Sequence, residues 1–235
     1  MKGTAQMATA TVMNLSRETL SILKNFSSIN SNILISPGSR LRTISPAKNV
    51  LAEATVEEHF DTQVALWDMN KFLGTVSLFK DPVFEFNENH VVITGENGSS
   101  VKYFYAEPKL ITSVEKEINL PETVIEFDLL ESQFSEIQRA SSVLGLPDLC
   151  VKSDGDKTNL VAMDKQDAGS NSYSIAVGDN STGADFTMFF KVENLRVLGG
   201  DYHVEITERV VSKFTHKNLD LSYCIALESD STYDG

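Results

Sequence analysis

The segment "LSRETLSILKNFSSIN", residues 15–30, decides the fold because it contains the clearest amphipathic helix in the chain. Its apolar residues recur at helical spacing and predict one buried face. The opposite face carries Arg17, Ser21, Lys24 and Ser28. No acidic residue lies in this stripe, although the whole chain has a formal net charge of -13. We therefore expect a helix that turns a positive face outward in an acidic protein.

Length and composition are those of an ordinary globular protein. The 235 residues, 41% hydrophobic and 23% charged, suffice for one large domain or two domains of about 100 residues each. No apolar run approaches the roughly 20 residues that cross a bilayer, and the first residues lack the apolar core of a secretory signal. We therefore expect an intracellular protein, with Cys150 and Cys224 as buried free thiols.

The order of predicted elements occurs twice. After the first helix, period-two segments predict short strands over residues 32–67, followed by a short helix over 67–79 and strands over 83–106. A second helix is predicted over 129–146, and strands, a short helix in "KVENLRVLGG" (191–200) and further strands follow it. Two copies of one α+β module, offset by roughly 115 to 125 residues, explain this order best.

The second long helix has the same two faces as the first. The residues expected on its apolar face are Leu130, Phe134, Ile137 and Leu144. The residues expected on its outward face are Ser132, Ser135, Arg139 and Ser142. Both long helices thus combine a face that can pack on a sheet with a face of small hydroxyls and isolated cations.

The domain boundaries follow from these elements. Residues 1–12 form an N-terminal extension, either a disordered arm or a start assigned too early. Module 1 is expected over 13–107 and module 2 over 122–235. The connector, 108–121, lies between two prolines and lacks helical period, so its middle is available as an edge strand for a partner segment.

The outward cations suggest loose contact with a polyanion. The six residues expected to face DNA are Arg17, Lys24, Lys71, Arg139, Lys191 and Arg196. Any one alone is interpreted equally well as a solvated surface residue, but their recurrence in both modules favours a shared role. Isolated cations attract phosphates without reading bases. Since two modules are too small to enclose a duplex, an enclosing assembly would be a head-to-tail ring.

Four segments together resemble the DNA polymerase sliding clamp of T-even-type tailed bacteriophages. They are "NLSRETLSILKNFSSIN", "DMNKFLGTVSL", the connector after "VKYFYAEP" and the ending "YCIALESDSTYDG". The resemblance implies two modules of the sliding-clamp type, each with two helices packed on antiparallel sheets. It also implies a closed homotrimeric ring around duplex DNA, in the cytoplasm of the infected bacterial host.

The resemblance further implies partners and a docking groove. The ring would tether the replicative DNA polymerase through its C-terminal peptide, be loaded by a clamp-loader ATPase and serve other replication and late-transcription proteins. The groove is expected between the connector and the last strand, at Leu110, Ile111, Val114, Ala226 and Leu227. These five residues could equally be core or edge residues.

Other classes of protein fit less well. The histidines are scattered, and no P-loop, nucleophile elbow or dinucleotide-binding motif occurs, so we expect no catalytic residue, metal or cofactor. Glu228 and Asp230 are interpreted as part of a solvated tail. A non-catalytic, β-rich structural or assembly protein of a virion stays open as the alternative, because such a protein could also be acidic and oligomeric.

Overall fold

The computed structural model describes residues 10–114, 120–208 and 211–235, which form two compact units. Unit 1 holds the described residues of Met1–Pro46 and Glu53–Glu115, and unit 2 holds those of Ala47–Ala52 and Lys116–Gly235. The expected connector is therefore divided, since its residues 108–114 group with unit 1. The grouping of Ala47–Ala52 with the second unit was not expected from the sequence.

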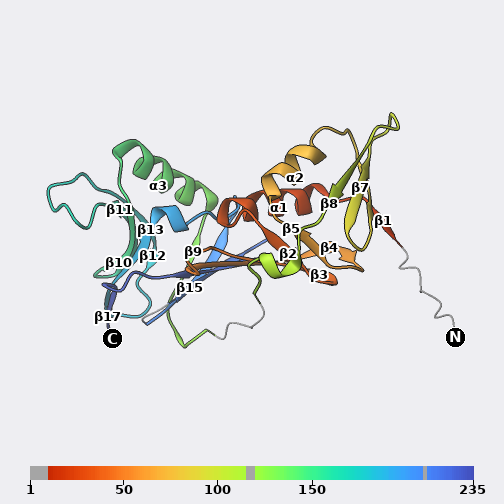
Figure 1. Cartoon of the computed structure of the whole chain (residues 1–235). Coiled ribbons are helices and arrows are strands. Elements are labelled where there is room, and N and C mark those ends of the chain that lie inside the picture. Colours follow the sequence, from red (N-terminus) through yellow and green to blue (C-terminus); the bar gives the residue numbers. More distant parts are fainter. Residues whose placement is uncertain (1–9, 115–119, 209–210) are drawn as a thin grey trace. The chain divides into compact units, whose positions relative to one another are not determined.

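Unit 1 contains two α-helices, one 3-10 turn and eight strands among its described residues (Figure 1). Its elements are β1 (Thr11–Met13), α1 (Arg17–Ile29), β2 (Ile33–Ile35), β3 (Gly38–Ile44), β4 (Val50–Phe60), β5 (Val64–Leu66), α2 (Met69–Val76), β6 (Val83–Phe86), β7 (His90–Thr94), β8 (Ser100–Phe104) and η1 (Pro108–Leu110). The start of β4, Val50–Ala52, belongs to the segment that groups with unit 2.

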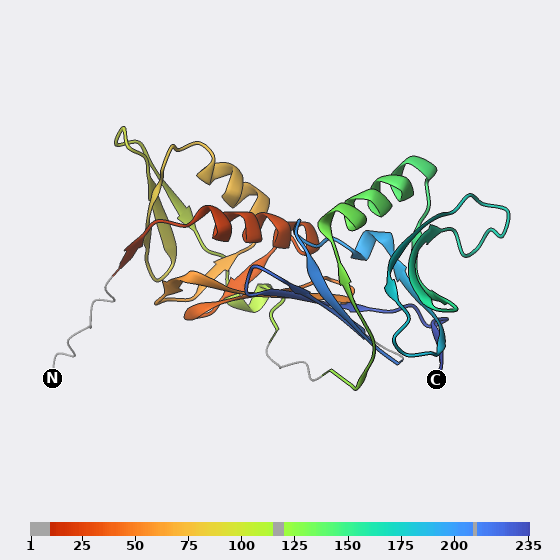
Figure 2. The same cartoon turned by 180° about the vertical axis from the view of Figure 1, so that it is seen from behind.

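The helices of unit 1 follow the predicted pattern. Helix α1 begins after Ser16, whose hydroxyl accepts the Thr19 N–H at 3.1 Å, and α2 begins after Asp68, whose carboxylate accepts the Lys71 N–H at 2.8 Å. The two helices contact each other, and α1 contacts β3. Figure 2, the view from behind, shows α1 and α2 on one side of the strands. Phe26 and Phe72 are buried beneath them.

The antiparallel sheet β1-β6-β7-β8 extends unit 1 to residues expected to lie outside it. Strand β1 pairs with β6, and Met13 lies opposite Phe84. Residues 11 and 12, placed in the N-terminal extension by the sequence, therefore belong to the sheet, because β6 offers its outer edge to them. Residues 1–9 of that extension lie outside the described residues.

Unit 2 contains one α-helix, one 3-10 turn and nine strands among its described residues. Its elements are β9 (Thr123–Leu129), α3 (Glu131–Leu144), β10 (Asp148–Asp154), β11 (Lys157–Met163), β12 (Tyr173–Asp179), β13 (Asp185–Lys191), η2 (Val192–Asn194), β14 (Tyr202–Thr207), β15 (Val211–His216), β16 (Leu221–Ala226) and β17 (Thr232–Asp234). One antiparallel sheet has the order β12-β11-β10-β13-β17, and β9, β14, β15 and β16 pair in that order in another.

Helix α3 packs on β11 and β12, but its buried face differs from the prediction. Phe134, Ile137 and Ser141 are buried, whereas Leu130 and Leu144 are exposed. Leu130 precedes the first helical turn. At the other end Gly145 adopts a left-handed conformation (φ 68°), so the chain turns and Leu146 enters the core in place of Leu144.

The second short helix is reduced to the single 3-10 turn η2. Strand β13 continues through Lys191, and the Val192 N–H donates to the Pro147 carbonyl at 3.0 Å, which extends the pairing by one residue. Too few residues then remain before Gly199 and Gly200 for a helix to form. Lys191 and Arg196 therefore lie before and after a turn, not on a helix face.

The two cysteines lie in strands, as predicted, but in different surroundings. Cys150 on β10 is a buried thiol, and burial raises its pKa to about 12. Cys224 on β16 is partly exposed, contrary to the prediction, because the outward side of β16 is only half covered.

Candidate DNA-facing helices and partner groove

The predicted positive stripe is present on α1. Arg17, Ser21, Lys24 and Ser28 are all exposed, while Thr19, Ile22, Leu23, Phe26 and Ile29 on the opposite face are buried. Neither Arg17 nor Lys24 forms an ion pair with another described residue. The stripe therefore presents two uncompensated cations among hydroxyls, a surface that attracts phosphate without base contacts.

A buried carboxylate fixes the start of α1. Glu58 on β4 accepts the Ser16 N–H and the Thr19 hydroxyl, both at 2.5 Å, and its side chain is almost fully buried. A carboxylate at a helix N-terminus also interacts favourably with the helix dipole. Glu58 thus determines where the positive face of α1 begins. Glu58 was not predicted from the sequence, although a charged residue at an inward position between Val56 and Phe60 was a usable signal.

Helix α2 adds a third cation beside this stripe. Lys71 is exposed and, among the described residues, has no ion-pair partner. Asn70 on α2 accepts a hydrogen bond from Ser27 of α1 at 3.0 Å, which ties the two outward faces together. A shallow groove of about 490 Å³ runs between the helices, lined by Leu20, Lys24, Leu73, Phe79 and other residues. The cations of unit 1 therefore lie on one pair of contacting helices.

The start of α3 is capped by a distant residue. Asp201 accepts the Glu131 N–H at 2.8 Å, and Gln133 accepts the Leu130 N–H at 3.0 Å. Arg139, the predicted cation of this helix, is exposed. Its neighbour on the same face, Glu136, accepts a hydrogen bond from the Tyr173 hydroxyl, and this bond raises the pKa of Tyr173. The outward face of α3 is consequently of mixed charge.

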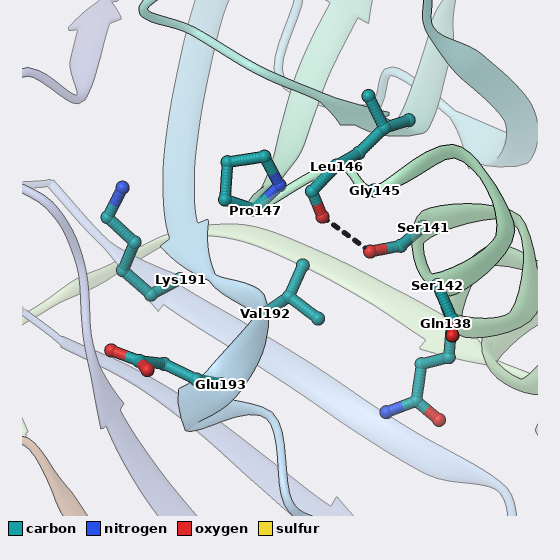
Figure 3. Close-up of a pocket in the computed structure, with 9 residues that line it drawn as sticks. All are labelled: Gln138, Ser141, Ser142, Gly145, Leu146, Pro147, Lys191, Val192 and Glu193. Atoms are coloured by element: carbon teal, nitrogen blue, oxygen red, sulfur yellow. Dashed lines mark hydrogen bonds between the residues drawn. The ribbon is translucent and has the colours of Figure 1, made fainter.

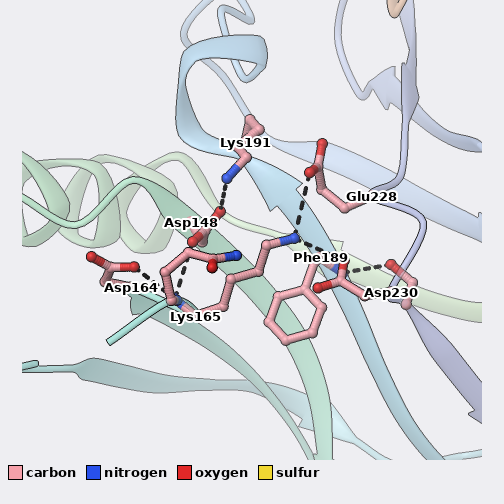
Figure 4. A network of polar contacts seen from close by, with 9 residues as sticks. Asp148, Asp164, Lys165, Phe189, Lys191, Glu228 and Asp230 are labelled. Carbon is pink, nitrogen blue, oxygen red and sulfur yellow. Dashed lines mark hydrogen bonds and ion pairs between the residues drawn. The ribbon is translucent and has the colours of Figure 1, made fainter. Parts of the chain in front are cut away.

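Lys191 does not present an uncompensated charge. Its ammonium lies 2.6 Å from Asp148, a fully buried carboxylate on β10 (Figure 4). Figure 3 shows the neighbouring depression of about 650 Å³, in which Gln138 and Ser142 of α3 lie opposite Glu193. Arg196 is exposed, and its Nε donates to the Glu193 carbonyl at 2.8 Å. Of the three cations expected in unit 2, one is therefore neutralised within the unit.

The connector residues of the expected groove differ in exposure. Leu110 is 62% exposed and Val114 is half-buried, whereas Ile111 is only 6% exposed. Ile111 is thus a core residue of unit 1, because η1 turns its side chain inward, and it cannot form an exposed groove wall. The Arg42 guanidinium donates to the Val114 carbonyl at 3.2 Å and anchors this part of the connector. The expected edge strand in the middle of the connector falls on residues 115–119, outside the described residues.

The other expected groove residues lie at the end of β16. Ala226 and Leu227 are half-buried, and the Ala226 N–H donates to the Asn49 carbonyl at 2.8 Å within unit 2. The groove itself, which would combine residues of both units, stays a prediction.

The C-terminal segment is anchored and is not a solvated tail. Lys165, almost fully buried, contacts Asp230 at 2.8 Å and Glu228 at 3.4 Å, and its ammonium lies 5.1 Å from the centre of the Phe189 ring (Figure 4). The hydrogen bond from Lys165 lowers the pKa of Asp230. Strand β17 then pairs with β13. These contacts hold the residues that follow Leu227 in place.

The described residues contain no group of three or more His, Cys, Asp or Glu side chains arranged to bind a metal ion. Over the same residues, every helix is too short or too polar to cross a membrane.

Comparison with known proteins identifies the family. A family model described as "gp45 sliding clamp, C terminal" matches residues 126–229. The chain is 33% identical over 222 residues to the protein named sliding clamp of Vibrio phage KVP40, and the match covers 92% of this chain and 100% of that protein.

Solved structures show the same fold at low sequence identity. The PCNA2-PCNA3 complex of Sulfolobus tokodaii matches with a TM-score of 0.70 and 14% identity, over 94% of this chain and 100% of that chain. The Helicobacter pylori beta clamp bound to a DNA ligase peptide matches with a TM-score of 0.70 and 13% identity, over 97% of this chain and 68% of that chain. The 33% identity to the KVP40 sliding clamp does not support the alternative of a virion structural protein. The chain belongs to the sliding clamp family of T-even-type bacteriophages.

Proposed function

We propose that the chain assembles into a closed homotrimeric ring that encircles duplex DNA and tethers the replicative DNA polymerase for processive synthesis. The observation that carries this proposal is the face of α1, where Arg17 and Lys24 are exposed without ion-pair partners among the described residues. Such cations attract the DNA backbone at any sequence, which suits a protein that must stay on DNA while moving along it.

Edge strands offer a route to ring closure. In unit 1, β8 is at the edge of its sheet, and in unit 2, β12 is at the edge of another. Pairing of β8 of one protomer with β12 of the next would be heterologous, and three such interfaces related by rotation would close a ring. It would also remove two edges that are otherwise open to aggregation.

The proposed role requires no chemical reaction by the chain itself. Opening and closing of the ring would be carried out by a clamp-loader ATPase, and the ring would also serve other replication proteins and late-transcription factors. The site of action would be the cytoplasm of the infected bacterial host. Protein partners are expected to bind by short peptides, and the Helicobacter pylori clamp, which was solved with a DNA ligase peptide, supports this mode of binding.

The proposed docking groove consists of Leu110 and Val114 from the connector with Ala226 and Leu227 from the end of β16. Leu110 is an exposed apolar side chain of the kind that peptide anchors bury. Because Arg42 anchors the connector and Lys165 anchors the segment after Leu227, both proposed walls are held within their own units.

The first experiment measures mass and encirclement together. Light scattering should give a species of about 78 kDa, three times the 25.9 kDa chain, because C3 closure needs three protomers. Protein threaded onto linear duplex should be lost at high salt from open ends and retained when both ends are blocked. A monomer at every concentration, or equal loss from blocked and open DNA, would contradict encirclement.

The second experiment tests the groove. Leu227→Asp should abolish binding of the C-terminal peptide of the phage polymerase, measured by fluorescence anisotropy, without changing the oligomeric mass. Leu78→Asp is the control, because Leu78 is an exposed leucine of unit 1 that is not among the proposed groove residues. Unchanged peptide affinity in Leu227→Asp would exclude Leu227 from the groove.

A further inference from the structure

The outward helix faces of the two units differ in charge. In unit 1, Arg17, Lys24 and Lys71 are exposed, and none pairs with an acid among the described residues. The two acidic residues of this region are Glu18 and Asp68. Asp68 is occupied as the N-cap of α2, where it accepts the Lys71 N–H at 2.8 Å. Cations therefore outnumber acids on the α1–α2 face.

The corresponding region of unit 2 has the opposite balance. Glu131, Glu136 and Glu193 are exposed there, against Arg139 and Arg196. The third basic residue, Lys191, is compensated by the buried carboxylate of Asp148 at 2.6 Å (Figure 4). The depression between α3 and η2 in Figure 3 accordingly has an acid, Glu193, at its rim. With Lys191 compensated, exposed acids outnumber exposed cations on this face.

We infer that unit 1 supplies nearly all the attraction between the clamp and the DNA backbone, and that unit 2 contributes close to none. The inference rests on the proposed encirclement of DNA. It follows from the short range of charge interactions in salt, because charges more than about 8 Å away are largely screened at physiological ionic strength. A phosphate near α3 therefore meets the local balance of Arg139 with Glu136.

A DNA-attracting face confined to unit 1 would also explain how the chain can be so acidic. If only the α1–α2 face must attract DNA, the remaining surface, including that of α3, is free to carry the net charge of -13. In a trimer, three attractive sectors would alternate with three near-neutral ones. Within each protomer, only unit 1 would attract the DNA backbone, which limits the number of phosphate interactions that must break as the ring moves along the duplex.

The test uses two double variants that each remove two charges. Arg17→Gln with Lys24→Gln alters unit 1, and Arg139→Gln with Arg196→Gln alters unit 2. Affinity for a short, open-ended, fluorescein-labelled duplex is measured by anisotropy over a series of salt concentrations, with light scattering to verify the trimer. Open ends let the duplex enter the ring without a loader.

The unit 1 variant should bind DNA roughly tenfold more weakly. The slope of log K against the logarithm of the salt concentration should become shallower by about 0.9 for each phosphate that the variant no longer neutralises. The unit 2 variant should stay within about twofold of the wild type, with the same slope. Equal or larger losses in the unit 2 variant would overturn the inference while leaving encirclement intact. If the wild-type trimer itself shows no salt-dependent binding, the proposed function fails instead.

A single-charge variant of unit 2 provides an independent check. Glu193→Gln removes an acid from the unit 2 face without touching a cation, so DNA affinity should again stay within about twofold of the wild type, with the same salt slope. Glu57→Gln is the control, since Glu57 is an exposed acid on β4. A clear gain of affinity in Glu193→Gln, beyond any gain in Glu57→Gln, would show that DNA responds to the charge of the unit 2 face, which would overturn the inference.

Discussion

Removing the Glu58 carboxylate is expected to destabilise unit 1 by about 3 kcal/mol. Glu58→Ala leaves the Ser16 N–H and the Thr19 hydroxyl without their acceptor, and each buried donor costs about 1–3 kcal/mol when unsatisfied. The lost interaction with the helix dipole adds about 0.3–1 kcal/mol, while water entering the space left by the side chain offsets part of the total. Glu58→Gln keeps one acceptor oxygen, so it should reduce the stability of unit 1 by less than Glu58→Ala does.

Urea unfolding followed by tryptophan fluorescence measures this effect. Trp67 is the single tryptophan of the chain, and it lies in unit 1 just before α2, so its emission reports on the affected unit. All variants are compared at one protomer concentration, because assembly contributes to apparent stability. Glu57→Ala, the exposed neighbour, is the control. A loss below about 0.5 kcal/mol for Glu58→Ala, typical of a surface substitution, would refute the anchoring role.

Three further predictions concern unit 2. Lys165→Met should speed amide hydrogen exchange in β17, because it removes the contact with Asp230. In the wild type, Lys165 lowers the pKa of Asp230, so the stabilisation of β17 by this contact should be complete above the ordinary Asp pKa. It should be lost as the pH falls through the lowered pKa of Asp230. Asp230→Asn should abolish that pH dependence; its persistence would assign the effect to another group. Gly200→Ala should cost roughly 3 kcal/mol in thermal unfolding, since φ is 143° and the new Cβ would lie 2.1 Å from His216 Nε2. Asp201→Ala should cost about 1 kcal/mol by uncapping α3, and unchanged α3 hydrogen exchange would contradict this.

The features of unit 1 that depend on local periodicity were predictable. Helix α1 was predicted with both faces because the 3.6-residue period is contained in one short segment. The role of Glu58 in anchoring α1 was not predicted, because the hydrogen bond between the Ser16 N–H and Glu58 joins residues 42 positions apart. Strand β1 was missed since three residues are too few to show a period.

The site in unit 2 shows why residue type alone does not determine charge. Lys191 and Arg139 were equivalent in the sequence, but only the structure shows that Asp148 lies buried beside Lys191. Similarly, Leu144 continues the apolar face of α3 in the sequence, yet the left-handed turn at Gly145 moves the chain so that Leu146 is buried instead. Both differences depend on packing partners that lie outside the helix itself.

The membership of Ala47–Ala52 in unit 2 determines how the chain can be divided and when it can fold. A single cut in the connector would not separate the units, because a fragment beginning after the connector lacks six residues that pack with it. On the ribosome, those six residues emerge long before the rest of unit 2, so they can pack only after the rest of unit 2 has been synthesised. Production of unit 2 alone would therefore require residues 47–52 to be supplied as a fused or separate peptide.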